Sequence, residues 1–262
     1  MDNLFNNKTI LITGGAGSFG KNFTKFLLDN YKPKKLLIFS RDEFKQFKMA
    51  EEIKDDRLRF FIGDIRDLPR LQRALNGVDV VIHAAALKQV PILEYNPFEA
   101  VKTNILGTQN VIDAAIDNKV KKVLLISSDK AVQPINLYGA TKLCAEKLFV
   151  SANSYSPHKT LFSSVRYGNV VGSRGSIVET LVASEKTTGK VKITDPDMTR
   201  FWLTLDQSFK LVTFALENMA GGEIFVPKIP SMKMGDLFDA IVPAAKKEVI
   251  GLRPGEKMHE IL

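Results

Sequence analysis

Cysteine is nearly absent from this sequence, in which Cys144 is the only one among 262 residues. A single cysteine excludes an internal disulfide framework and a cysteine-rich zinc site, and we expect no metal. Also missing is any run near the ~18 consecutive apolar residues of a membrane-spanning helix. The first residues lack the hydrophobic region of a secretory signal peptide. We therefore expect a cytoplasmic protein with no membrane partner.

Blocks of basic residues are also missing, although 37 Lys and Arg against 29 Asp and Glu give a formal net charge of +8. With 45% hydrophobic and 25% charged residues, the composition is that of a globular protein and excludes wholesale disorder. The positive excess suits either nucleic acid or small anionic molecules. No motif interleaves basic and aromatic residues, so we expect no nucleic-acid partner.

Short apolar runs alternate with helical periodicity along most of the chain. Buried strands are predicted at Lys8–Thr13, Lys35–Phe39, Arg59–Ile62, Val78–His83, Lys122–Ser127 and Leu161–Tyr167. This alternation predicts parallel strands with right-handed crossovers, and so an α/β fold with a Rossmann-type doubly wound sheet. The regularity declines after about residue 168, where Met232–Ile241 is expected to be an isolated helix in a smaller lobe.

A glycine-rich turn follows the first predicted strand and opens a helix. Gly14, Gly17 and Gly20 form a GxxGxxG pattern that also contains Ser18 and Phe19. Glycine lets the backbone approach a pyrophosphate, and the helix N-terminus adds N–H donors and a positive dipole end. The position between strand and helix favours dinucleotide binding over an ordinary tight turn.

The end of the second strand indicates which dinucleotide is bound. Ser40 and Arg41 stand there, with Lys45 one helical turn further, and these side chains suit a 2′-phosphate. Asp42 and Glu43 come too late to reach the ribose hydroxyls unless the register slips. The sequence therefore favours NADP over NAD.

Small or acidic residues follow the next two strands. Asp64 and Ile65 come after the third strand, where Asp64 can reach the adenine amino group. Ala84 follows the fourth strand, where the backbone must pass the cofactor. His83 is expected to pack at that strand end rather than to catalyse.

A Tyr-x-x-x-Lys pair provides the candidate reacting groups. On a helix, Tyr138 and Lys142 would share one face. A neighbouring ammonium lowers the pKa of a phenol, so Tyr138 can accept a proton from a sugar hydroxyl while hydride leaves the same carbon. Ser128, Asp129 and Lys130 follow the fifth strand and can converge with this pair, because parallel strands end at one edge of the sheet.

Together these residues resemble the extended short-chain dehydrogenase/reductase family, and within it the inverting UDP-N-acetylglucosamine 4,6-dehydratases of pseudaminic acid biosynthesis. The segments that carry the resemblance cover nearly the whole chain: SRDEFKQF (40–47), HAAALKQVPILEYNP (83–97), DKAVQPINLYGATK (129–142), RYGNVVGSRGS (166–176), TDPDMTRFW (194–202), FVPKIPSMK (225–233) and RPGEKMHE (253–260). Ser128 departs from the usual threonine but keeps the hydroxyl. The related capsular-polysaccharide dehydratases often lack the tyrosine at position 138.

The resemblance implies a set of catalytic roles. Tyr138, assisted by Lys142, would deprotonate the C4 hydroxyl as NADP+ takes the C4 hydride. Lys130 would remove the C5 proton, and Asp129 would protonate the departing C6 hydroxyl. Hydride then returns to C6, and C5 is reprotonated from the opposite face.

The resemblance also implies the binding residues and the domain plan. The UDP-sugar would contact Lys88, Asn169, Arg200, Arg253 and Glu256, the two arginines holding the diphosphate. Residues 1–165 would form the NADP-binding domain with the catalytic residues, and 166–262 an interleaved UDP-sugar-binding lobe. Family members commonly form homo-oligomers and continue past the RPGEK segment, so we expect a missing C-terminal tail.

Three alternatives stay open. A UDP-hexose 4-epimerase has the same fold but needs no pair such as Asp129 and Lys130. A retaining 4,6-dehydratase carries an acid where Lys130 stands. A non-catalytic NADP-binding sensor needs neither Tyr138 nor Lys142.

Overall fold

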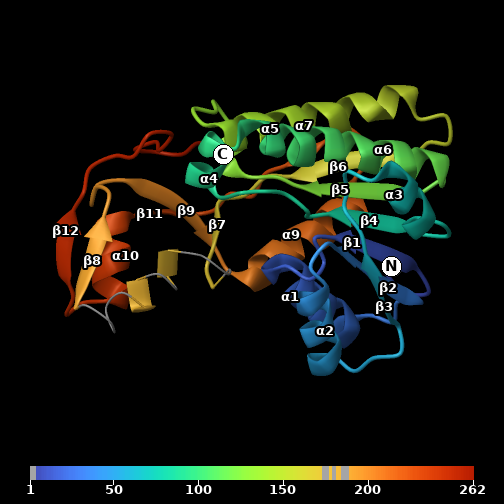
Figure 1. Cartoon of the computed structure of the whole chain (residues 1–262), viewed down its shortest axis with the longest axis horizontal. Helices are drawn as coiled ribbons and strands as arrows, with labels where there is room; N and C mark the ends of the chain where they lie inside the picture. Colours follow the sequence, from blue (N-terminus) through green and yellow to red (C-terminus); the bar gives the residue numbers. More distant parts are fainter. Residues whose placement is uncertain (1–3, 173–176, 179–180, 184–188) are drawn as a thin grey trace.

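The computed structural model describes residues 4–172, 177–178, 181–183 and 189–262. Its centre is a seven-stranded parallel sheet in the order β10-β6-β5-β4-β1-β2-β3 (Figure 1). The strands are β1 (Thr9–Thr13), β2 (Lys35–Ser40), β3 (Leu58–Ile62), β4 (Val80–His83), β5 (Lys122–Ile126), β6 (Leu161–Val165) and β10 (Ile224–Phe225). The order reverses between β1 and β4, and doubly wound sheets bind ligands beside the strand ends at such a point.

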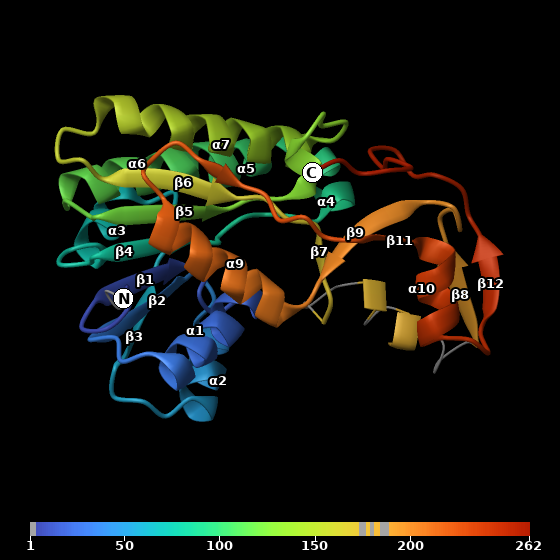
Figure 2. The ribbon, with the colours of Figure 1, turned by 180° about the vertical axis from the view of Figure 1, so that it is seen from behind.

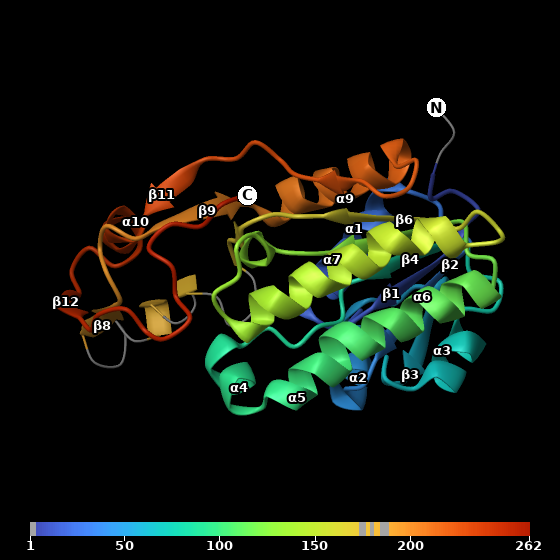
Figure 3. The ribbon, with the colours of Figure 1, turned by 90° about the horizontal axis from the view of Figure 1, so that it is seen from above.

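Helices cover both faces of the sheet, so that its central strands are buried on both sides (Figure 3). One face carries α1 (Ser18–Asn30), α2 (Glu43–Glu52) and α9 (Leu205–Asn218), and the other carries α3 (Leu68–Ala74), α6 (Gly107–Asp117) and α7 (Leu137–Tyr155). Phe23 and Phe209 join α1 to α9 across the first face, and Phe149 packs α7 against the second. The predicted α/β class and doubly wound sheet are confirmed.

Between β4 and α6 the chain forms three short helical segments. These are α4 (Val90–Tyr95), α5 (Pro97–Ala100) and the π-helix η1 (Val101–Leu106), which continues into α6. The 3₁₀ turn η2 (Asp129–Ala131) lies between β5 and α7. Both groups stand near the carboxyl edge of the sheet.

The remaining strands form a smaller lobe beside that edge (Figures 1 and 2). Its elements are β7 (Asn169–Val170), β8 (Lys190–Ile193), β9 (Thr199–Leu203), β11 (Ser231–Lys233), α10 (Met234–Ile241) and β12 (Lys246–Val249). They make the sheets β11-β9-β7 and β12-β8 over a separate core that contains Trp202 and Phe238. Because α9 and β10 return to the main sheet, the lobe is interleaved with it.

The C-terminal half differs from the sequence expectation in detail. The predicted helix at Met232–Ile241 begins instead at Met234, because Ser231–Lys233 pairs antiparallel with β9. It ends before Pro243, as expected. Residues 173–176 of the RYGNVVGSRGS segment lie outside the described residues.

Two kinds of feature are absent from the described residues. No helix there has the length and apolar character to cross a bilayer. Nor does that part of the chain gather three or more His, Cys, Asp or Glu side chains in a metal-binding group.

Candidate functional site

A cavity of about 1540 Å³ lies at the carboxyl edge of the main sheet and extends to the smaller lobe. Its lining contains every site residue predicted from the sequence except Asp129. The cofactor candidates are Gly14, Gly17, Ser18, Phe19, Gly20, Ser40, Arg41, Lys45, Asp64, Ile65, Ala84, Tyr138 and Lys142; the others are Ser128, Lys130, Lys88, Asn169, Arg200, Arg253 and Glu256. One space therefore brings together residues from both predicted parts of the chain.

The glycine turn is packed too tightly for side chains. Gly14 has φ +65°, and a Cβ there would lie 2.9 Å from the Cα of Ala85. A Cβ at Gly20 would lie 2.5 Å from the Cα of Gly15. The turn ends at Gly17, the N-cap of α1, which has no side-chain cap. The first N–H groups of this helix therefore point toward the cavity without a capping side chain.

The end of β2 has the register that the NADP prediction requires. The strand ends at Ser40, and the Gln46 amide donates to the carbonyls of Ser40 and Phe61, both at 2.9 Å. Asp42 caps α2 by accepting from the Lys45 N–H at 2.9 Å, so it belongs to the helix rather than to the strand end. A register slip is therefore absent.

Acidic side chains accompany the basic ones at this end of the cavity. Arg41 is exposed, and its Nη1 lies 3.4 Å from Asp64 Oδ2. Arg66 also donates to Asp64, at 2.7 and 2.9 Å. Lys45 pairs with Asp42. The pair between Arg41 and Asp64 is long and solvent-exposed, so an arriving phosphate can compete for Arg41 at little energetic cost.

His83 is buried at the end of β4 and has a structural role, as expected. Its Nδ1 lies 2.7 Å from Thr13 Oγ1 and its Nε2 lies 3.0 Å from Thr108 Oγ1. Thr13 in turn accepts from the Ala85 N–H at 3.2 Å, which holds the segment after β4. Burial, together with the charge of Lys142, lowers the pKa of His83 to about 3.

This buried histidine should make the fold sensitive to acid. Because the folded pKa of about 3 lies below the ordinary 6.5, the unfolded chain takes up a proton between these values and the folded chain does not. The free energy of unfolding therefore has its full value above pH 6.5, and it falls by up to about 5 kcal/mol as the pH is lowered toward 3. In His83→Leu, the free energy of unfolding measured with urea should change less with pH in the acid range than it does in the wild type. The exposed-site control His158→Leu should retain the wild-type slope, and equal slopes in all three proteins would contradict this role.

The Tyr138–Lys142 pair lies on the first turns of α7, as predicted. Asn136 caps this helix by accepting from the Gly139 N–H at 2.8 Å. Lys142 is buried, and its Nζ donates to the Ile126 carbonyl at 2.7 Å. Burial lowers the pKa of Lys142 to about 8, although the Glu146 carboxylate opposes this shift.

The pKa of Tyr138 is raised in the protein without a cofactor, and the lowering expected beside an oxidised nicotinamide stays a prediction. Burial raises this pKa to about 12; a hydrogen bond with Ser128 acts against this rise and the charge of Asp129 adds to it.

A buried carboxylate below this pair escaped the sequence reasoning. Glu146 accepts from Ser127 Oγ at 2.6 Å and from Arg166 Nη2 at 2.6 Å. Ser127 follows β5 and Arg166 follows β6, so Glu146 on α7 joins the ends of these two strands next to the catalytic turn η2. The i,i+4 spacing from Lys142 is the sequence signal that points to it.

The η2 turn holds the candidate elimination pair. Asp129 Oδ1 accepts from Ser128 Oγ at 2.8 Å and from Lys130 Nζ at 3.0 Å. Lys130 Nζ also lies 3.4 Å from Asn169 Oδ1. Gly139 allows this packing, because a Cβ there would lie 2.1 Å from the Lys130 carbonyl oxygen.

Asp129 is placed differently from its neighbours. Its side chain is 1% exposed and does not line the cavity. Oδ2 has no hydrogen-bond partner among the described residues. The carboxyl thus lies directly behind Ser128 and Lys130, which do line the cavity.

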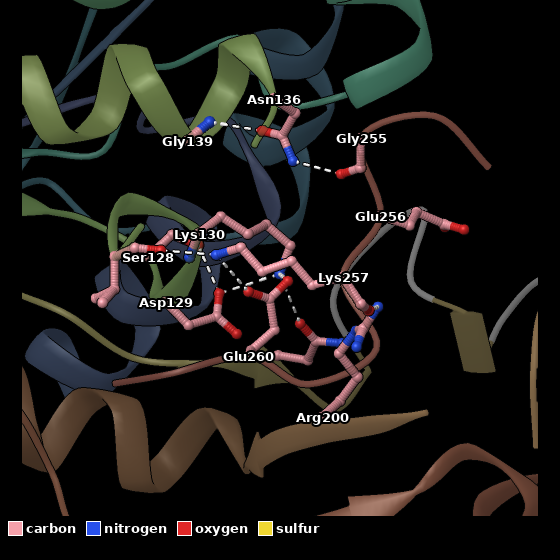
Figure 4. Close-up of polar contacts among 12 residues, drawn as sticks. Ser128, Asp129, Lys130, Asn136, Gly139, Arg200, Gly255, Glu256, Lys257 and Glu260 are labelled. Carbon is pink, nitrogen blue, oxygen red and sulfur yellow. Dashed lines mark hydrogen bonds and ion pairs between the residues drawn. The ribbon is translucent and has the colours of Figure 1, made fainter. Parts of the chain in front are cut away.

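The predicted diphosphate residues are engaged with the last segment of the chain. Arg200 donates to the carbonyls of Thr199, Lys257 and Met258 at 2.7, 3.0 and 3.3 Å. Arg253 pairs with Glu256. Arg200 therefore supports the C-terminal segment as well as lining the cavity (Figure 4).

Comparison with known proteins places the chain among relatives that act on nucleotide sugars. The UDP-N-acetylglucosamine 4,6-dehydratase (inverting) of Campylobacter jejuni is 57% identical over 261 residues, covering 99% of this chain and 78% of that protein. The UDP-glucose 4-epimerase of Rickettsia prowazekii is 45% identical over 267 residues, with 99% and 78% covered. A solved structure, Pen from Bacillus thuringiensis, superposes with a TM-score of 0.95 at 46% identity and covers 98% of this chain and 82% of its own.

The family comparison agrees with the resemblance carried by the sequence motifs. The model of the family described as polysaccharide biosynthesis protein matches residues 10–262. The chain therefore belongs to the polysaccharide biosynthesis protein family.

Proposed function

We propose that this protein is an NADP-dependent lyase that dehydrates UDP-N-acetylglucosamine across C5 and C6 with inversion at C5. The product would be UDP-2-acetamido-2,6-dideoxy-β-L-arabino-hex-4-ulose, the first intermediate of pseudaminic acid biosynthesis. The observation that carries the proposal is that Lys130, paired with Asp129, lines the same cavity as Tyr138 and the glycine turn. The 57% identity to an inverting dehydratase supports the same reaction.

The cavity fits a dinucleotide cofactor. Gly14 and Gly20 let the turn pack closely against Ala85 and Gly15, and the uncapped N-terminus of α1 suits a pyrophosphate. Ser40, Arg41 and Lys45 would hold the 2′-phosphate, with Asp64, Ile65 and Ala84 around the adenosine and Tyr138 and Lys142 beside the nicotinamide. When bound, the oxidised cofactor supplies a hydride acceptor and a positive charge.

One group of residues would then carry out the oxidation at C4, and a second group the elimination across C5 and C6. Tyr138 accepts the C4 hydroxyl proton while the C4–H bond is broken, and Lys142 orients the sugar and cofactor hydroxyls. Ser128 lies between Tyr138 and Asp129, so it links the oxidation site to the elimination pair.

In the elimination, the 4-keto group acidifies C5, and Lys130 removes the C5 proton. The C5–H electrons form the C5–C6 double bond. Asp129, which lies behind Ser128, would give its proton to the C6 hydroxyl through Ser128 Oγ, and the C6 hydroxyl would leave as water. Tyr138 and Lys142 would hold the nicotinamide that supplies the hydride for C6, and protonation of C5 from the opposite face would complete the reaction.

The smaller lobe would bind the UDP-sugar. In this plan residues 1–165 bind the cofactor and carry the reacting groups, and 166–262 supply Asn169, Arg200, Arg253 and Glu256, with Lys88 approaching from the first part. The family resemblance adds a homo-oligomer to the proposal, and the scarcity of cysteine adds a cytoplasmic location.

The nearest alternative is a 4-epimerase, because a relative of that name is 45% identical. Mass spectrometry of the product from purified protein, NADP+ and UDP-N-acetylglucosamine separates the two. Loss of one water supports the dehydratase, whereas an isomer of unchanged mass supports the epimerase.

Cofactor choice is expected to depend on Arg41. In Arg41→Ala, the loss of a charge-assisted contact of about 1.5–3 kcal/mol should weaken NADP+ binding roughly 10- to 100-fold and leave NAD+ binding nearly unchanged. Calorimetric titration with both dinucleotides measures the ratio. Arg59→Ala, which replaces an arginine on β3 outside the cavity lining, is the control. Equal losses for both cofactors would contradict a 2′-phosphate role.

A further inference from the structure

The C-terminal segment 253–260 lies across the turn that carries the candidate elimination pair (Figure 4). Asn136 Nδ2 donates to the Gly255 carbonyl at 2.8 Å, and Lys257 Nζ donates to the Val132 carbonyl at 2.6 Å. These bonds join the segment to the beginning of α7 and to the residue after η2. The segment is therefore attached directly to the catalytic turn.

The same segment is fastened to the smaller lobe on its other side. The Thr199 N–H donates to the Met258 carbonyl at 2.9 Å, and Thr199 Oγ1 lies 2.9 Å from His259 Nδ1. Arg200 adds its bonds to the carbonyls of Lys257 and Met258. These contacts fix the backbone immediately before Glu260.

Glu260 directs its carboxylate at Lys130. Oε1 lies 3.8 Å from Lys130 Nζ, and Oε2 lies 3.3 Å from Lys257 Nζ. The Glu260 side chain is only 4% exposed, so this charge is poorly screened by water. It also lines the cavity that contains Lys130. No step of the proposed mechanism uses Glu260.

The charge balance of the elimination gives Glu260 a role. For the step to proceed, Lys130 must be a neutral amine and Asp129 must carry the proton destined for C6. At that moment Asp129 is neutral, so Glu260 is the remaining carboxylate within 4 Å of Lys130 among the described residues. As Lys130 takes the C5 proton, it becomes an ammonium, and a fixed anion beside it stabilises the charge that develops in the transition state.

We propose that Glu260 is a positioning residue for Lys130, which holds the amine toward the substrate and stabilises the positive charge that it gains on taking the C5 proton. This inference rests on the proposed dehydratase function. It assigns the C-terminal segment a part in the elimination step and none in the oxidation at C4.

The test compares turnover of substrate deuterated at C4 with that of substrate deuterated at C5. Glu260→Gln keeps the shape and removes the charge. It is expected to lower kcat roughly 10- to 100-fold, to raise the C5 isotope effect and to bring the C4 effect toward unity. Glu260→Asp keeps the charge and should recover part of the turnover. Asp206→Asn, which breaks an exposed ion pair with Lys210, should leave both isotope effects unchanged.

A merely structural role for Glu260 predicts a different pattern. Slower turnover of Glu260→Gln with both isotope effects at their wild-type values would overturn the proposal, as would wild-type turnover. If that variant does not fold, as judged by thermal unfolding, Lys257→Met supplies the test, because it removes the partner that holds Glu260 Oε2. It should raise the C5 effect and bring the C4 effect toward unity, and unchanged isotope effects would overturn the proposal. Failure of the wild-type protein to release water from UDP-N-acetylglucosamine would instead refute the proposed function itself.

Discussion

Lys130→Ala is expected to stop dehydration while oxidation at C4 continues. The variant lacks the amine that removes the C5 proton, and loss of a general base lowers the rate of a step by roughly 10²–10⁴-fold. The first half of the reaction should survive, because Tyr138 and Lys142 lie on α7 and keep their own contacts. Rapid mixing with substrate should therefore show reduced cofactor in the near-ultraviolet spectrum without release of product.

An exposed lysine of α7 provides the matched control. Lys147→Ala removes the same functional group outside the cavity lining and should turn over like the wild type. Wild-type dehydration by Lys130→Ala would remove this residue from the mechanism. Loss of the initial cofactor reduction as well would show that Lys130 does not act at C5 alone.

Lys142→Met is expected to abolish turnover and yet to stabilise the fold. Burial lowers the pKa of Lys142 from 10.5 to about 8. This shift means that the buried ammonium destabilises the folded protein by about 3 kcal/mol. Methionine fills the same volume without a charge. Below pH 8 the variant should thus gain up to about 3 kcal/mol in the free energy of unfolding.

The direction in which stability changes with pH provides a second check on this prediction. Between pH 8 and 10.5 the unfolded chain keeps the Lys142 proton and the folded chain has lost it, so wild-type stability rises across this range. Urea unfolding should show that rise in the wild type and in the exposed control Lys147→Met, but not in Lys142→Met. A variant less stable than the wild type at every pH would contradict the account.

The central strands of the main sheet could be predicted because they are buried on both faces, whereas the short edge strand β10 was not predicted. Strands buried on both faces are continuous apolar runs, and β1 and β4 have no exposed residue. The smaller lobe could not be predicted in this way. Strand β12 is mostly charged and pairs with β8, more than 50 residues earlier, through backbone bonds that leave no apolar pattern. Helix α9 was missed although Thr204 and Gln207 form a capping box before its apolar face.

The same distinction between local patterns and long-range contacts applies to the candidate site. The glycine turn, the end of β2 and the Tyr138–Lys142 pair are local patterns, and the structure brings them to one cavity. The buried position of Asp129 and the contact between Glu260 and Lys130 depend on packing between distant segments. Arg200 illustrates the difference, because its residue type suits phosphate while its contacts in the folded chain are backbone carbonyls.

The most direct test of the proposed reaction is NMR of the product formed from UDP-N-acetylglucosamine in heavy water. Removal of the C5 proton by Lys130 and reprotonation from the opposite face predict a 4-keto-6-deoxy sugar with deuterium at C5 and the L-arabino configuration. A product with retained configuration at C5, or a C4 epimer without deuterium, would contradict the account.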